Sequence, residues 1–336
     1  MILLPFPGLT GLLSGPLSSF TGFLLSVVRR LGSLPGLTLW FHSPTLLTAA
    51  GIILLFTGFC SYIRIRPFLR SVCLLIGSVS LVISLLPLSH TVTEYIQFSA
   101  GNADAAVLWD QDKVYVIDAG EDDGTLSSFL LSRRLIPDAV ILTHLHADHA
   151  GGLRSLIDDG IPVRLIYLPE GAEAAQIHPD FHALLQELRN SGAEIRTLSR
   201  GNTLSFPSGS LTVLWPEKDK VRPGQDANNY SLVSRLILNG TVFLHTGDLN
   251  GSYEQYCASP ADILKAAHHG SASSTLPDFL SAVSPDTVLL SARHLSRQVA
   301  FQDRIPGAVV YGTPEYGAVT VRFNENSYTV IPFLKQ

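Results

Sequence analysis

The chain has 336 residues, 46% of them hydrophobic, and a formal net charge of −5 at pH 7. This length allows one large domain and a further segment. Its three cysteines, with no CxxC pair among them, exclude a disulfide framework. The charges are unevenly placed. Residues 1–88 hold no acidic residue and five of the 23 basic ones, which leaves 18 basic beside all 28 acidic residues in 89–336.

Residues 1–88 are apolar and predict a membrane segment of two or three hydrophobic helices. Two stretches, 45–63 and 69–88, each approach the roughly 20 residues that a helix needs to cross a bilayer. A third stretch, 8–31, is interrupted by Gly15-Pro16. It is either a short span or a helix lying in the membrane interface, and the sequence leaves both possibilities open.

The orientation of this segment follows from its arginines. Arg64, Arg66 and Arg70 lie between the two firm spans or at the start of the second. The positive-inside rule places such a loop in the cytoplasm. The sequence therefore predicts a multi-pass protein of the bacterial cell membrane, with residues 89–336 on the extracytoplasmic side.

Residues 89–336 predict a globular α/β domain. Alternating or continuous apolar runs indicate strands, and apolar residues spaced at 3.6 indicate helices. Asn239-Gly240 is a strong signal for a two-residue hairpin turn. The succession of elements fits two packed sheets with helices outside. The predicted strands are 93–98, 105–108, 113–117, 139–142, 163–168, 194–198, 211–215, 231–238, 241–244, 262–267, 287–290, 309–311, 318–323 and 327–331, and the predicted helices are 125–135, 153–159, 179–191, 276–283 and one starting at 252–256.

The stretch 143–152, Thr-His-Leu-His-Ala-Asp-His-Ala-Gly-Gly, dominates the chemistry. It follows a buried strand and holds His144, His146, Asp148 and His149 on one loop. Imidazole nitrogen and carboxylate oxygen are ligands that zinc, manganese and iron accept. We expect the two glycines that follow to let the backbone turn sharply before the next helix.

One loop supplies too few ligands for a closed two-metal site, so partners are expected further along the chain. Asp248 follows the apolar run 241–244, and His268 and His269 follow the run 263–267. Each polar group thus stands at the end of an apolar run. The sequence predicts that these loops meet at one edge of the sandwich.

The order of these motifs resembles that of the metallo-β-lactamase superfamily, and Asp118-Ala119-Gly120 resembles its early Asp-Gly motif. Within the superfamily, residues 228–233 and 264–271 resemble the C-terminal domain of ComEC-type competence proteins, the membrane channels of bacterial DNA uptake. The stretch 97–104, Gln-Phe-Ser-Ala-Gly-Asn-Ala-Asp, departs from the family's opening motif, and 291–297 lacks its Gly-His-Pro. The chain also lacks most of the channel-forming spans.

The resemblance implies an αββα four-layer sandwich that binds two divalent metal ions, zinc or manganese. Of the late histidines we favour His268, which lies nearer the strand end, with His269 as the alternative. Where many members add a histidine to the first site, this chain offers Asn228, Asn229 and Ser231. Because an amide oxygen is a weaker ligand, we expect a weak first site or one that prefers manganese. The implied ligands are His144 and His146 for the first metal, Asp148, His149 and the late histidine for the second, and Asp248 as the bridge.

The leading hypothesis is a membrane-anchored phosphodiesterase, a nuclease that acts on DNA, expected as a single strand, outside the cytoplasm with other competence or channel proteins. Two metal ions would activate water and clamp the phosphodiester. The alternatives are a hydrolase of another phosphodiester or ester in the cell envelope, and a non-catalytic DNA-guiding part of an uptake channel. The candidate catalytic residues are Asp148, with His269, Ser271 and His294 as proton donors.

The charge of the domain argues against a nuclease, because phosphate contacts dominate nucleic-acid affinity and residues 89–336 are net acidic. Two divalent cations would offset about four negative charges locally. A local basic patch is the remaining possibility. The arginines available for it are Arg189, Arg196, Arg200, Arg293, Arg297 and Arg304.

Overall fold

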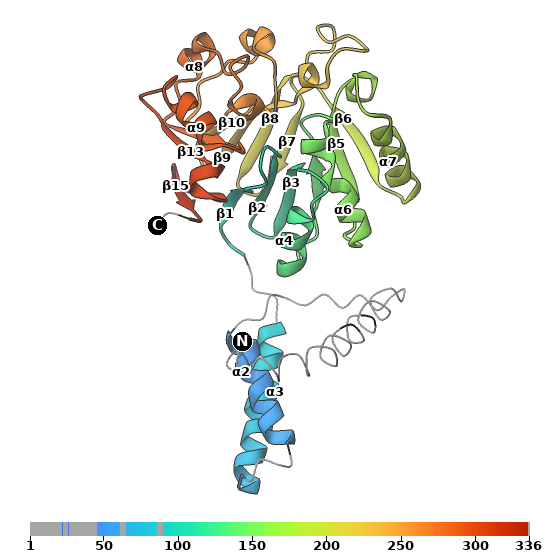
Figure 1. Cartoon of the computed structure of the whole chain (residues 1–336), viewed down its shortest axis with the longest axis vertical. Coiled ribbons are helices and arrows are strands. Elements are labelled where there is room, and N and C mark those ends of the chain that lie inside the picture. Colours follow the sequence, from blue (N-terminus) through green and yellow to red (C-terminus); the bar gives the residue numbers. More distant parts are fainter. Residues whose placement is uncertain (1–21, 23–25, 27–45, 61–64, 86–89, 335–336) are drawn as a thin grey trace, which may run out of the picture.

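The computed structural model describes residues 22, 26, 46–60, 65–85 and 90–334. Its first elements are the helices α2 (Leu46–Phe59) and α3 (Pro67–Leu85), which pack against each other as a hairpin (Figure 1). Their backbones approach closely where the glycines lie, since a Cβ on Gly51 would stand 3.2 Å from the carbonyl oxygen of Gly77.

The predicted spans are found as shorter helices. The stretch 45–63 yields the 14-residue α2 and the stretch 69–88 the 19-residue α3. Within the described residues, no helix combines the length and the apolarity needed to cross a membrane. Residues 61–64 and 86–88 lie outside the described part, as does the predicted segment 8–31 apart from two residues.

From residue 93 the chain forms two sheets that lie face to face (Figure 1). The first has the order β15-β14-β1-β2-β3-β4-β5-β6, and the second the order β13-β12-β11-β10-β9-β8-β7. The strands are β1 (Thr93–Gln97), β2 (Ala105–Asp110), β3 (Lys113–Ala119), β4 (Ala139–Ile141), β5 (Leu165–Pro169), β6 (Glu194–Leu198), β7 (Thr203–Phe206), β8 (Gly209–Trp215), β9 (Val233–Leu238), β10 (Thr241–His245), β11 (Ile263–Lys265), β12 (Thr287–Leu290), β13 (Val309–Gly312), β14 (Val319–Asn324) and β15 (Ser327–Pro332).

Three apolar cores hold four layers together. Alternate residues of a strand face opposite sides, so Val107 of β2 packs under helices while Leu108 packs between the sheets. A third core lies between the second sheet and its own helices. The αββα architecture expected from the sequence is therefore present. The helices are α4 (Thr125–Arg133), α5 (Ala147–Ala150), α6 (Gly152–Asp158), α7 (Pro179–Asn190), α8 (Pro277–Val283), α9 (Leu295–Gln302) and α10 (Thr313–Tyr316), with 3₁₀ turns η1 (Ala172–Ala174), η2 (Ala227–Tyr230), η3 (Gly251–Tyr256) and η4 (Ala267–Gly270).

Most predicted elements are confirmed within a few residues. The hairpin at Asn239-Gly240 joins β9 to β10, and both turn residues have positive φ. Four helices and strands were missed. β7 is short and alternates with serine and threonine, α9 spans only eight residues, and α5 and α10 span four each. The helix expected at 252–256 is a 3₁₀ turn instead.

The glycine pair after the histidine-rich loop serves a different purpose from the one expected. Gly151 has helical dihedral angles, with φ −58° and ψ −40°, and therefore makes no sharp turn that only glycine allows. Space is the constraint. A Cβ on Gly152 would stand 2.1 Å from the carbonyl oxygen of Ala119, because α6 begins directly against the end of β3.

Replacing Gly152 with alanine is expected to destabilise the fold, because backbone must move to admit the methyl group. Overpacking of this kind costs about 1–3 kcal/mol, which corresponds to a fall in Tm of several degrees. Thermal unfolding followed by circular dichroism measures it. Gly307→Ala is the matched control, since no atom lies within 4 Å of its added Cβ. Equal Tm values for the two variants would contradict this explanation.

Candidate metal centre

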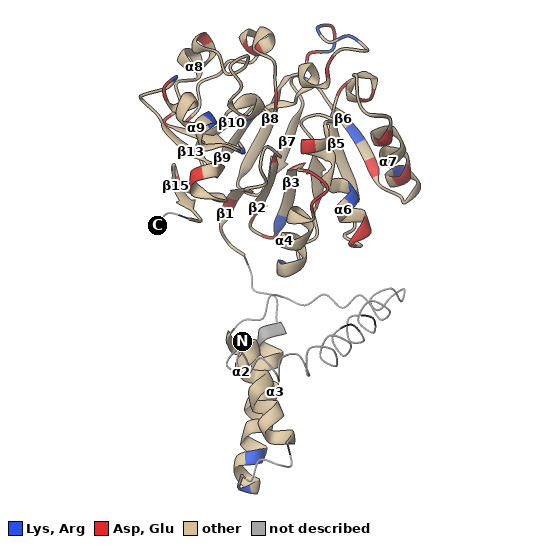
Figure 2. Ribbon diagram, in the orientation of Figure 1, with Lys and Arg blue, Asp and Glu red and all other residues tan. Residues whose placement is uncertain are grey.

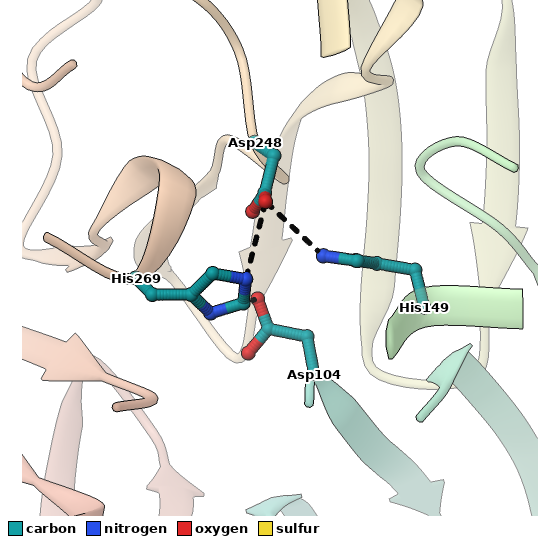
Figure 3. A group of neighbouring side chains, drawn as sticks. All are labelled: Asp104, His149, Asp248 and His269. Carbon is teal, nitrogen blue, oxygen red and sulfur yellow. Dashed lines mark ion pairs between the residues drawn. The ribbon is translucent and has the colours of Figure 1, made fainter. Parts of the chain in front are cut away.

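Three loops from both sheets converge on one buried site. The loop after β4 brings His144 to His149, the loop after β10 brings Asp248, and η4 after β11 brings His269. Figure 3 shows the side chains of His149 and His269 reaching Asp248 from different elements. These loops meet at one edge of the sandwich, as the sequence predicts.

Asp248 lies at the middle of this cluster. Its Oδ2 is 3.3 Å from Nε2 of His149 and 3.1 Å from Nε2 of His269. The same His269 nitrogen is 3.3 Å from Oδ2 of Asp148. Nε2 of both histidines and Oδ1 of Asp248 are nevertheless buried without a hydrogen-bond partner. These nitrogen and oxygen atoms lie close together but are not aligned for hydrogen bonds. Such an arrangement is expected when the atoms bind the same cation.

A second pair of imidazoles lies beside this cluster. Nε2 of His144 is 3.1 Å from Nδ1 of His146, and the ring centroids of His144 and His149 are 4.1 Å apart. Two nitrogens at a tetrahedral zinc, each bonded at about 2.0–2.1 Å, stand about 3.4 Å apart. The His144–His146 separation is close to that value, so these two nitrogens fit one metal ion.

The late histidine that reaches the cluster is His269, and the preference for His268 is not supported. His268, His269 and Gly270 have φ of 49°, 52° and 71°. This left-handed run turns His269 inward to a buried position, while His268 remains partly exposed. Strained dihedral angles at non-glycine residues cluster at functional sites. On this geometry His269 is the better candidate ligand.

Two charged residues fix the segment that follows His269 in the chain. The guanidinium of Arg304 donates to the carbonyl oxygens of Gly270 and Ser271 at 3.4 and 3.1 Å. The buried carboxylate of Glu254 accepts hydrogen bonds from the backbone N–H groups of Thr275 and Leu276. The unusual backbone at His269 is thus supported by contacts that fix residues 270–276 directly after it.

Asp118, from the Asp-Ala-Gly motif, supports His149 from behind. Its Oδ2 is 2.8 Å from Nδ1 of His149 and accepts a hydrogen bond from Oγ1 of Thr143 at 2.6 Å. A carboxylate on the far nitrogen orients an imidazole ligand and raises its basicity. Gly247 lets the other loop approach, because a Cβ there would lie 2.7 Å from Cβ of Thr143.

The ionisation of the cluster reflects its crowded carboxylates. Burial alone disfavours protonated histidine, but Asp248 and Asp118 together raise the pKa of His149 well above its usual value. Against the same burial, Asp248 and Asp148 raise the pKa of His269 to about 9. Burial lowers the pKa of His144 well below its usual value. A cation that binds the cluster would therefore displace protons from His149 and His269.

The three residues expected near the first metal site have different surroundings. Ser231 is buried, and its Oγ accepts a hydrogen bond from the backbone N–H of Asp248, so it fixes the loop. Asn228 has a buried Oδ1 without a partner, which makes it the better candidate for an oxygen ligand. Asn229 contributes its backbone oxygen to Nε1 of Trp215.

The three candidate proton donors have different surroundings. Nε2 of His269 faces two carboxylates, and a nitrogen that binds a metal ion carries no proton to transfer. Ser271 pairs with Ser273 through a 3.0 Å hydrogen bond, and His294 is exposed at the start of α9. His269 is therefore better placed as a ligand than as a donor.

Sequence reasoning missed two buried charges at the centre, Asp104 and Lys265. Nζ of Lys265 lies 2.7 Å from Oδ2 of Asp104. The atoms of Asp104, His149, Asp248 and His269 that can bind a metal all lie within 4.8 Å of one another. The available signal was Asp104 at the end of the 97–104 stretch, where the family's opening motif also ends in aspartate.

The six arginines do not form one patch. Arg189, Arg196 and Arg200 pair with Glu173, Glu194 and Glu217 in that order, and Arg304 is occupied by the loop carbonyls. Arg293 and Arg297 are exposed on the segment that starts α9, and neither has an acidic partner among the described residues. Of the proposed set, these two lie near the centre and remain available.

A pocket that includes Arg297 lies beside Gly270, the residue after His269. Arg297 lies close to Gly270, since its Cγ would be 3.7 Å from a Cβ there. The pocket is lined by Gly270, Ala272, Ser296, Arg297, Ala300 and Arg304.

Comparison with known proteins agrees with this geometry. Residues 99–294 match the model of the metallo-β-lactamase superfamily. The chain is 34% identical to ComE operon protein 3 of Bacillus subtilis over 160 residues, which cover 46% of this chain and 20% of that protein. It is 27% identical to competence protein ComA of Neisseria gonorrhoeae over 201 residues, which cover 56% of this chain and 25% of that protein.

The chain thus spans about a fifth to a quarter of the length of these relatives. A solved metallo-β-lactamase-fold protein, YhfI of Bacillus subtilis, is 14% identical with a TM-score of 0.46, covering 65% of this chain and 95% of YhfI. The four-layer sandwich, the buried cluster of metal-binding side chains and the family match lead to one conclusion. The chain belongs to the metallo-β-lactamase superfamily of hydrolases, where it is related to competence proteins of the ComEC type.

Proposed function

We propose that the protein is a metal-dependent phosphodiesterase that cleaves DNA during uptake. The observation that carries this proposal is the convergence of Asp148, His149, Asp248 and His269, in which Nε2 of both histidines is buried without a hydrogen-bond partner. The competence proteins that the chain resembles point to DNA as the substrate. Cleavage of only small phosphodiesters, or DNA binding without turnover, would instead favour the other two hypotheses.

The residues suit two cations. Asp148, His149, Asp248 and His269 would hold one of them. His144 and His146 would hold the other, with Asp248 shared between the two and Asn228 as a weak additional ligand. The mixed nitrogen and oxygen set accepts zinc or manganese. Bound there, divalent cations supply Lewis-acid activation of water and of a phosphoryl oxygen.

The chain's own side chains have separate tasks in this proposal. Asp118 fixes the His149 ring, and Ser231 fixes the backbone at Asp248, so that the cluster keeps its shape without substrate. Arg297, beside Gly270, is available to contact a phosphate of the strand. This local contact compensates for the net acidity of the domain, since electrostatic attraction acts mainly within about 8 Å at physiological salt.

We further propose that the hairpin α2–α3 attaches the protein to the membrane, with the hydrolase domain outside the cytoplasm. Many large apolar side chains of the hairpin are exposed, and exposed apolar patches of this kind mark contact with a membrane or a partner. They include Ile53, Phe56, Phe59, Phe68 and Leu75. Figure 2 shows that the described charges of the hairpin lie at one end of it.

Asp248→Ala is expected to abolish metal-dependent cleavage of single-stranded DNA, because both cations lose a shared ligand. The loss should exceed the 10–100-fold typical of residues that only support a ligand. The assay follows cleavage of a labelled strand with Mn²⁺ or Zn²⁺. Asp219→Ala, which removes an exposed loop carboxylate, is the control. Residual activity of Asp248→Ala near that of the control would rule out the proposed centre.

Replacing each late histidine separately tests which one binds metal. His269→Ala is expected to lower the metal content of the purified protein by about one ion per chain, because Nε2 of His269 faces two carboxylates. His268→Ala, whose ring lies outside the cluster, should keep the full content. Elemental analysis after dialysis gives the stoichiometry. The reverse pattern would restore the original preference for His268.

A reporter fused after Gln336 tests the membrane topology. With the arginine-containing loop inside, an alkaline phosphatase fusion, active only outside the cytoplasm, should be active and retained in the membrane fraction. A fusion with a reporter that works only in the cytoplasm is the matched control and should be inactive. Activity of the cytoplasmic reporter alone would contradict the orientation.

A further inference from the structure

Lys265 is the one lysine among the fully buried side chains of the described domain. It ends β11 in the second sheet, and its Nζ donates to Oδ2 of Asp104 at 2.7 Å and to the carbonyl oxygen of Ala266 at 3.3 Å. Asp104 directly precedes β2 in the first sheet and is equally buried. The ion pair therefore joins the two sheets directly beneath the metal-binding cluster.

Such a pair is not explained by stability. Taking two charges out of water costs several kcal/mol per ion, and apolar residues of similar volume often stabilise a protein as well or better. Apolar side chains such as Phe243 and Leu289 lie between the sheets here, together with the polar His245, which pairs with Lys265 across the strands. Stability alone therefore does not account for the two charges, which points to a role in the adjacent site.

The surroundings of His269 indicate what the role of the ion pair is. Its Nε2 faces Asp248 and Asp148, while its Nδ1 is buried without a hydrogen-bond partner. The carboxylate nearest to Nδ1 is that of Asp104, with Oδ2 at 3.9 Å (Figure 3). His149 has the same arrangement in tighter form, with Nδ1 against Asp118. Each imidazole is thus backed by one buried carboxylate.

Asp104 is held in place by further contacts. Its Oδ1 accepts a hydrogen bond from Nε2 of Gln97 at 3.3 Å, and Tyr95 in turn donates to Gln97 at 3.0 Å. Both carboxylate oxygens are therefore occupied. An ammonium at 2.7 Å also repels any cation that approaches the same oxygen, so Lys265 disfavours Asp104 as a metal ligand.

We propose that Lys265 and Asp104 form a positioning pair for the metal ligand His269. Lys265 holds the Asp104 carboxylate where it can accept the Nδ1 proton of His269, and it keeps that carboxylate out of the coordination sphere. Nε2 of His269 then remains free for the metal. The inference rests on the proposed metal centre, but not on the nature of the substrate.

Metal binding by the full chain, without substrate, tests the pair. Lys265→Met with Asp104→Leu removes both charges and the acceptor, and the affinity for Mn²⁺ or Zn²⁺ in calorimetric titration should fall 10–100-fold. Lys265→Met with Asp104→Asn keeps an acceptor oxygen beside Nδ1 and should restore most of the affinity. A Met/Leu variant that folds and binds as tightly as the wild type would overturn the proposal.

Asp110→Asn is the matched control, because Asp110 is a buried carboxylate at the other end of β2. It should lower the Tm and leave metal affinity within about twofold of wild type. Equal loss of affinity in Asp110→Asn would show a general effect of stability and overturn the proposal.

If the double variant Lys265→Met, Asp104→Leu does not fold, the single variant Lys265→Met tests the proposal instead. Lys265→Met alone frees Asp104, which should join the ligands and add a carboxylate oxygen to the metal shell in X-ray absorption. An unchanged shell would count against the pair. Because no readout involves DNA, a protein that binds metal yet cleaves no DNA would refute the proposed nuclease and leave this inference standing.

Discussion

The site depends on one buried carboxylate, that of Asp248, which faces imidazoles from both sheets. A buried carboxylate without a cationic partner is costly. Here the protonated rings of His149 and His269 compensate for it, and their raised pKa values report the same attraction. A divalent cation would replace those protons at the same positions. The surrounding structure, from the close approach at Gly247 to the hydrogen bond that Ser231 accepts from the backbone N–H of Asp248, serves to keep this carboxylate in place.

The sequence was informative where the ligands lie close together along the chain or at the end of a strong apolar run. His144 to His149 and Asp248 could be found in this way, as could the four-layer sandwich from the order of strands and helices. The choice between His268 and His269 could not be made, because it depends on a left-handed backbone that Arg304 and Glu254 hold from outside the loop.

Contacts between the sheets were also beyond reach of the sequence. Lys265 stands inside an apolar run, and nothing in that run indicates a partner 161 residues earlier. The glycines after the histidine-rich loop were recognised, but for the wrong reason, since close approach to neighbouring backbone demands them rather than a turn. Gly152 lies against Ala119, and Gly151 against Gly120 and Asp122. The short helix α9 was missed, although it carries one of the two available arginines.

The two sheets contribute unequal parts of the ligand set. His144, His146, Asp148 and His149 come from the first half of the domain, and Asp248 and His269 from the second. A ribosome delivers the first half before the second. A growing or truncated chain therefore has no complete set of ligands, and hydrolytic capacity arises only once both sheets have closed on each other. The complete ligand set is in this sense a property of the finished sandwich.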